Sequence, residues 1–246
     1  MSHLIAKTAR KNAIAYVGQK PWHGLGQELQ AGASIETWKD ESGLSYTIDR
    51  SAVTYTTGAG QVISMGNREV LYRTDTGAAL GVVSPQFQIV QPGEVLEFFR
   101  DLCAEQGFAL ETAGAIRGGA VFWALARTGD SMDLGRGGKR DEINGYLLLS
   151  SGADGNHATD CRPTSVRVVC NNTLTLANGR ANARAIKTAH NTTFDPAAVK
   201  RALGLVDHRG AWEKFREQMI ALQSVRVTDA QAAEFLADLI RPAKDA

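Results

Sequence analysis

A long stretch in the second half of the chain carries several cations and no acid. No Asp or Glu occurs between Asp160 and Asp195, whereas five basic residues do: Arg162, Arg167, Arg180, Arg184 and Lys187. Arginine pairs with phosphate through two parallel N–H donors, and Asn171 adds a neutral donor suited to a sugar–phosphate backbone. The stretch is therefore a candidate polyanion-binding surface. The alternative is a solvated face whose arginines form ion pairs with distant acids such as Glu97 or Asp101.

A second basic segment lies in a glycine-rich run at residues 135–140, which contains Arg136, Lys139 and Arg140. Glycine lets a backbone approach a ligand closely, so the run could touch a phosphate backbone alongside the longer stretch. It lacks the spacing of a nucleotide-binding phosphate loop, which argues against nucleotide hydrolysis. The alternative is a hairpin tip with no binding role.

Side chains that could bind a metal or act as nucleophiles are His157, Cys161, Cys170 and His190. Zinc sites usually have a close pair of ligands at each end, and only His157 and Cys161 form such a pair. The sequence has no nucleophile elbow and no metalloprotease His-Glu-x-x-His pair, and no acid/base pair of carboxylates stands out. We therefore expect no catalytic residue, no metal and no cofactor, and we predict a protein that is not an enzyme.

Near the start of the chain, Trp22 and His23 stand in a glycine-rich segment. Exposed, this pair would anchor a protein partner, because tryptophan is prominent among residues that dominate interface energetics. Buried, it would pin the N-terminal segment to the core. The sequence leaves both roles open.

The composition is that of an ordinary globular protein. The 246 residues carry a net charge of +1, with 43% hydrophobic and 22% charged residues, so a polyanion site has to be a local patch. The three cysteines do not suit a disulfide framework. We find no secretion signal and no apolar run of about 18 residues, and we expect a cytoplasmic protein that does not enter a membrane.

Periodicity predicts strands first, then a helix, more strands and finally helices. Alternating apolar residues predict hairpins over 46–90 and 108–126, and a continuous apolar run predicts a central strand over 143–149. Helical spacing predicts helices over 92–106 and 162–179, the second with Arg167, Asn171 and Thr175 on one polar face. Capping patterns at Asp195 and Thr228 predict further helices towards the end of the chain.

This order of elements predicts an α+β fold, with a mostly antiparallel sheet of hairpins packed against helices and a helical C-terminal segment. We divide the chain into an N-terminal arm at 1–45, an α+β core domain at 46–190 and a C-terminal helical segment at 191–246 that packs on the core.

Three segments resemble a known family: residues 15–26, which contain Pro-Trp-His-Gly-Leu-Gly; residues 81–92; and residues 166–174, which read Val-Arg-Val-Val-Cys-Asn-Asn-Thr-Leu. They are similar to the phage/plasmid-like protein family built on a bacterial domain of unknown function. The resemblance implies a protein of phages, prophages or plasmids that acts in the bacterial cytoplasm. It implies no particular biochemical activity.

Taken together, these observations favour a single-stranded-DNA-binding protein of a phage or plasmid. We expect it to act in mobile-element replication or recombination. Strand annealing is a narrower form of this activity. Strand-annealing proteins generally form rings, so we also expect a homo-oligomer. The rival hypothesis is a host-takeover or anti-defence protein that binds a bacterial protein, with Trp22 and His23 as its anchor.

Overall fold

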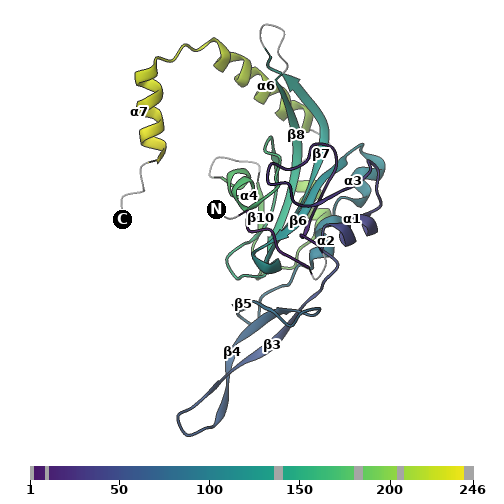
Figure 1. Ribbon diagram of the computed structural model, residues 1–246, viewed down its shortest axis with the longest axis vertical. Coiled ribbons are helices and arrows are strands. Elements are labelled where there is room, and N and C mark those ends of the chain that lie inside the picture. The colour runs from purple at the N-terminus through teal and green to yellow at the C-terminus, as the bar shows by residue number, and fades with distance from the viewer. Residues whose placement is uncertain (1–2, 9–10, 136–140, 180–184, 204–207, 241–246) are drawn as a thin grey trace.

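The computed structural model describes residues 3–8, 11–135, 141–179, 185–203 and 208–240 (Figure 1). Its strands form two sheets: one of seven strands in the order β10-β9-β8-β7-β6-β1-β2, and one of three strands in the order β3-β4-β5. Helices cover the larger sheet, and two further helices follow at the C-terminal end (Figure 1). The predicted α+β class with largely antiparallel sheets is confirmed.

Four consecutive antiparallel strands make the centre of the larger sheet. They are β6 (Ala109–Ile116), β7 (Val121–Asp133), β8 (Glu142–Gly152) and β9 (Thr159–Thr164). β10 (Ile186–Thr188) closes one edge, and β1 (Ile14–Tyr16) with the parallel β2 (Gln27–Glu28) closes the other. Both the hairpin predicted over 108–126 and the central strand over 143–149 are confirmed.

The strands of this sheet bury side chains on both faces. In β7, Phe122 and Ala124 belong to one apolar cluster and Trp123 and Leu125 to the other, as the alternation of a strand requires. The first cluster includes residues from α1 (Ile35–Glu41), α2 (Pro92–Glu97), α3 (Arg100–Glu105) and α5 (Pro196–Ala202). The second includes residues from α4 (Asn171–Ala177) and the segment before it. The helix predicted over 92–106 is thus two short helices, because the chain turns at Phe98 and Phe99.

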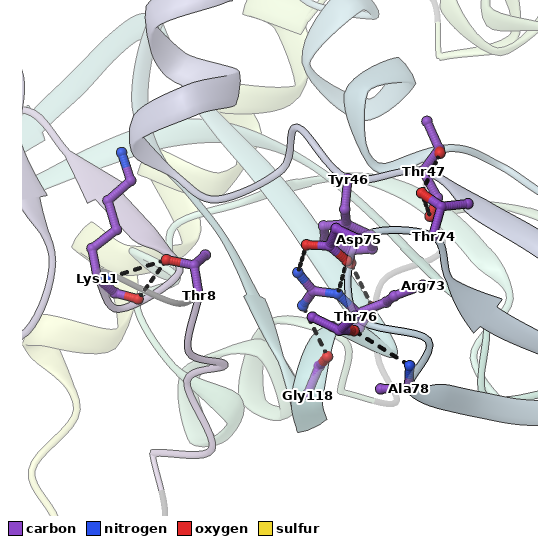
Figure 2. A network of polar contacts seen from close by, with 11 residues as sticks. Thr8, Lys11, Tyr46, Thr47, Arg73, Thr74, Asp75, Thr76, Ala78 and Gly118 are labelled. Atoms are coloured by element: carbon purple, nitrogen blue, oxygen red, sulfur yellow. Dashed lines mark hydrogen bonds and ion pairs between the residues drawn. The ribbon is translucent and has the colours of Figure 1, made fainter.

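The smaller sheet projects from the body, and the long hairpin of its first two strands reaches furthest (Figure 1). It consists of β3 (Ile48–Thr56), β4 (Val62–Arg73) and β5 (Ala79–Val83). Figure 2 shows the polar network at its base, where the buried Arg73 binds Asp75 and donates to the Gly118 carbonyl. The Arg73 guanidinium also lies 4.0 Å from the centre of the Tyr46 ring, and the Tyr46 hydroxyl donates to the Gly119 carbonyl. These contacts fix the hairpin to η1 (Arg117–Gly119), the turn between β6 and β7.

The structure differs from expectation in the first half of the basic stretch and in the N-terminal segment. Residues 162–170 are not helical, because Arg162 and Pro163 pair with β8 as part of β9, and Cys170 is the residue that precedes α4. Among the described residues of the predicted arm at 1–45, β1 is a buried strand inside the sheet and α1 packs on its face, so these elements belong to the core.

The C-terminal part is helical as predicted, with α6 (His208–Ser224) and α7 (Asp229–Ile240) after α5. Asp195 caps α5 by accepting from the Ala198 N–H, and Thr228 and Gln231 form the predicted reciprocal cap of α7. In α5, Val199 is buried, whereas α7 carries Phe235 and Leu236 exposed. In the part of the chain that the structure describes, no helix has the length and apolar character needed to cross a membrane.

Candidate functional site

The sequence motifs at 15–26 and 166–174 lie against each other. The segment 166–170 is held by the Thr112 hydroxyl, which donates to the Val168 carbonyl at 2.6 Å. His23 Nε2 lies 2.9 Å from the Val169 carbonyl oxygen, and His23 Nδ1 accepts from the Leu25 N–H at 3.1 Å. A carbonyl oxygen only accepts, so the ring proton sits on Nε2. His23 therefore joins the N-terminal motif to the segment that leads into α4.

Trp22 and His23 lie in different environments. The His23 ring provides the tether to the core. The Trp22 side chain meets the His23 ring edge-on, with 5.3 Å between ring centres, and remains 62% exposed. A large indole held at the surface beside a fixed turn is the arrangement that suits contact with a partner.

Arg167 does not lie on a helix and is not free. Its Nε donates to the buried Glu111 carboxylate at 2.5 Å, and its Nη2 donates to the Val17 carbonyl at 3.2 Å. Arg127 binds the other oxygen of Glu111 at 2.7 Å, so one buried carboxylate holds two guanidinium groups. Charge inside a protein requires such pairing. Arg167 thus pairs with an acid, but that acid is Glu111 and not Glu97 or Asp101, and Arg167 does not lie on a solvated helix face.

Arg162 is the clearest departure from the predicted surface, because it is only 1% exposed. Its guanidinium forms a two-point ion pair with Asp160 on the same strand. Its Nη1 also donates to the carbonyls of Ala177 and Gly179, at 3.3 and 3.4 Å. A cation suits the carbonyl end of a helix, so Arg162 fixes the end of α4 to the sheet and cannot contact a phosphate from this position.

Asn171 begins α4 and is half-buried. Its Oδ1 accepts from Arg117 Nη2 at 3.2 Å, and its backbone N–H donates to the His3 carbonyl. Arg117 also pairs with Asp154 at 3.3 Å. Asn171 thus links the N-terminal segment, the turn at η1 and α4.

Lys187 is the one predicted cation that the described residues place at the surface. Its side chain is 63% exposed on the edge strand β10, and its Nζ stays 3.9 Å from the Asp160 carboxylate. Arg180 and Arg184 lie outside the described residues, but both ends of their segment are placed. The Gly179 carbonyl accepts from Arg162, and Ile186 pairs with Cys161, the neighbour of Arg162 on β9. Arg136, Lys139 and Arg140 also lie outside the described residues.

The candidate metal ligands do not all gather at one place, although the His190 ring lies 3.0 Å from the His157 carbonyl oxygen. Cys161 belongs to the apolar cluster on one face of the sheet and Cys170 to the cluster on the other, and burial raises the pKa of the Cys161 thiol. His157 Nε2 lies 3.1 Å from the Ser150 hydroxyl, and burial lowers the pKa of the His157 ring. The His190 ring stacks on Phe87. Nowhere in the described ranges do three potential ligands gather in a metal-binding group.

Glu111 and Arg127 are the residues that sequence reasoning missed. Glu111 is a single acid in the otherwise apolar and small-residue strand 109–116. A lone carboxylate at a buried position needs a cationic partner, which is the signal that could have identified it. The partners themselves come from β7 and from the loop before α4, and no local pattern links those residues to Glu111.

Fold and site together define an α+β protein. Its largely antiparallel sheet is covered on both faces, a hairpin projects from it, and the acid-free stretch reaches the sheet edge. The chain belongs to the family described as Domain of unknown function (DUF932), whose model matches residues 79–246. The match includes the segment 166–174 but not the motif at 15–26. No curated protein and no solved structure matches the chain.

Proposed function

We propose that this protein binds single-stranded DNA at the β10 edge of its large sheet and catalyses no reaction, in the replication or recombination of a phage or plasmid. The observation that carries the proposal is the acid-free stretch together with the exposure of Lys187 at the point where the stretch meets the sheet. The binding cations are then Arg180, Arg184 and Lys187, with Arg136, Lys139 and Arg140 as further contributors.

Arg162 and Arg167 act as positioning residues in this proposal. Arg162 binds Asp160 at two points, which satisfies the acid closest to Lys187 from within the fold. The Lys187 ammonium remains available to a phosphate at the open edge. Arg167, by holding Val17 and Glu111, fixes the loop that leads into α4.

The outer face of α4 favours a single strand over duplex DNA. A helix that reads the major groove needs basic or amide side chains along its length. Helix α4 has seven residues, and its exposed side chains are Asn172, Thr175 and Leu176. A flexible strand that follows a basic sheet edge requires no such helix.

Fluorescence polarisation with a labelled oligonucleotide of about 40–60 nucleotides, long enough to cover several site sizes, tests the proposal. The triple variant Arg180→Ala/Arg184→Ala/Lys187→Ala should bind at least about tenfold more weakly at low salt. The slope of log affinity against log salt should fall by about 2, since each lost phosphate contact removes about 0.7. The variant Lys20→Ala/Arg201→Ala/Lys214→Ala removes the same charge elsewhere and should bind like wild type. No binding by wild type at low salt, or equal losses in both variants, would refute the proposal.

The exposure of Trp22 favours a second candidate, in which the protein binds a bacterial host protein. Trp22→Ala removes the exposed indole but leaves the His23 tether intact, so the fold should be unchanged. A host protein captured after nuclease treatment by wild type and not by Trp22→Ala would support this function. Equal capture by both proteins would exclude the Trp22 surface as the anchor.

A further inference from the structure

The tip of the projecting hairpin presents an apolar surface with no charge. We call residues 51–67 the hairpin tip; none of them is charged, while Arg50 and Arg68 flank them. Tyr55 and Ile63 face each other across the two strands, and both are exposed, Tyr55 by 51%. Val62 and Met65 are exposed beside them. An uncharged apolar surface of this kind suits a protein partner and offers no cation to a phosphate backbone.

Helix α7 presents a second apolar surface. Ala232, Phe235 and Leu236 are spaced i, i+3 and i+4 and therefore share one side of the helix. We call these three residues the α7 face. Phe235 is 65% exposed and Leu236 is exposed as well. Every charged residue of α7 is acidic: Asp229, Glu234 and Asp238.

Neither the hairpin tip nor α7 buries its large apolar side chains named above. A two-stranded ribbon is at best marginally stable in water unless it packs on something else. A helix of 12 residues is also marginal by itself, and its stability in a protein comes from burial of its apolar face. Both the hairpin tip and the α7 face would therefore gain stability from a partner surface.

The two surfaces do not cover each other within one molecule. Figure 1 shows the hairpin at one end of the longest axis and α7 towards the other end. We propose that the hairpin tip of one copy packs against the α7 face of a second copy. This contact is head-to-tail, and repeated copies would give a ring or an open filament.

The charges around the two surfaces complement each other. On the hairpin, Arg50 pairs with Glu69 and Arg73 with Asp75. Arg68 is exposed and forms no ion pair with an acid in the described ranges. It therefore provides a free cation beside the tip for the acidic α7 of the neighbouring copy, where opposite charges favour the correct pairing.

The base of the hairpin is built to hold the tip in place. Arg73, Tyr46 and the carbonyls of Gly118 and Gly119 lock the hairpin to the β6–β7 turn (Figure 2). Gly119 has φ +102, and a Cβ there would meet Arg73 Nη1 at 2.8 Å, so only glycine suits this junction. A projecting element that is already fixed loses less conformational entropy when it binds.

Light scattering coupled to size-exclusion chromatography of the full chain, without DNA, tests the contact. Wild type at tens of micromolar should be larger than a monomer. Tyr55→Ser/Ile63→Ser and Phe235→Ser/Leu236→Ser should each be monomeric, with unchanged circular dichroism. Leu176→Ser replaces an exposed leucine on α4, away from both surfaces, and should assemble like wild type. A monomeric wild type would overturn the proposal.

Mixing the two double variants distinguishes a head-to-tail contact from a symmetric one. One variant keeps the α7 face and the other keeps the hairpin tip, so the mixture should form a one-to-one dimer and nothing larger. If either double variant alone still assembled, the contact would pair like surfaces and the proposal would be wrong. The result is independent of nucleic-acid binding, because neither surface includes Arg180, Arg184 or Lys187.

Discussion

Arg162 and Lys187 come from the same acid-free stretch and lie close to the same acid, yet their environments are opposite. Arg162 is buried, binds Asp160 at two points and holds the end of α4. Lys187, across the strand pair, is exposed and lies 3.9 Å from Asp160. A run of cations in a sequence therefore does not define one surface. Pairing within the fold decides which of them are structural and which remain available to a ligand.

The largest expected effect is on stability at the inner cation. Arg162→Ala leaves Asp160 buried without its partner and frees two carbonyls at the end of α4, and it should cost about 3–5 kcal/mol of unfolding free energy. Lys187→Ala should change stability by less than about 0.5 kcal/mol. Urea denaturation measures both variants. A loss below about 1 kcal/mol in Arg162→Ala would contradict the structural role.

A smaller loss is expected at Glu111, the acid that holds Arg167. Glu111→Gln keeps the shape of the side chain but removes the charge that two guanidinium groups share, which should cost about 2–3 kcal/mol. The same denaturation experiment tests it. Arg127→Ala should cost less than Glu111→Gln, because Arg127 is partly exposed and Arg167 would still balance the carboxylate. The reverse order would show that Glu111 is not the centre of this cluster.

The burial of His157 also predicts that the free energy of unfolding depends on pH. Burial lowers the pKa of His157 below the ordinary 6.5, and Asp154 and Asp160 only partly oppose this effect. The unfolded chain therefore binds a proton at His157 before the folded protein does, so the folded state loses stability as pH falls below about 6.5. In His157→Gln this part of the pH dependence should disappear. An unchanged slope of unfolding free energy between about pH 6.5 and 5 would contradict it.

The sequence predicts the elements that depend on local signals. Alternation in 121–126 and the glycines at 118 and 119 predict the β6–β7 hairpin, and the cap at Asp195 predicts α5. The segment 162–170 could not be assigned in this way. Its valines fit helical spacing, but β-branched residues also favour strands, and the pairing of Arg162 with Leu148 on β8 decides the outcome.

The candidate site is less predictable than the fold for the same reason. The burial of Arg162 follows from its place in β9, and the tether between His23 and Val169 joins residues that are far apart in the chain. The hairpin tip shows the opposite case. Alternating apolar residues there predict a strand, which is correct, but they do not reveal that the strand projects away from the core.

The smallest expected effect concerns the charge beside the hairpin tip. Arg68→Glu should weaken assembly by a few-fold, since an exposed ion pair contributes at most about 1 kcal/mol. Glu234→Lys in the same chain should restore part of it. The midpoint of assembly against protein concentration measures both changes. If neither substitution changes the midpoint of assembly, charge does not contribute to the contact. The double variants then test its apolar part alone.

Ultraviolet cross-linking of the full chain to a thymidine-rich oligonucleotide, followed by peptide mapping, tests the division between inner and outer cations most directly. Cross-links should concentrate in residues 179–190, next to Lys187, and disappear at high salt. Cross-links confined to other parts of the chain, such as the hairpin tip or the turn around Trp22, would contradict it.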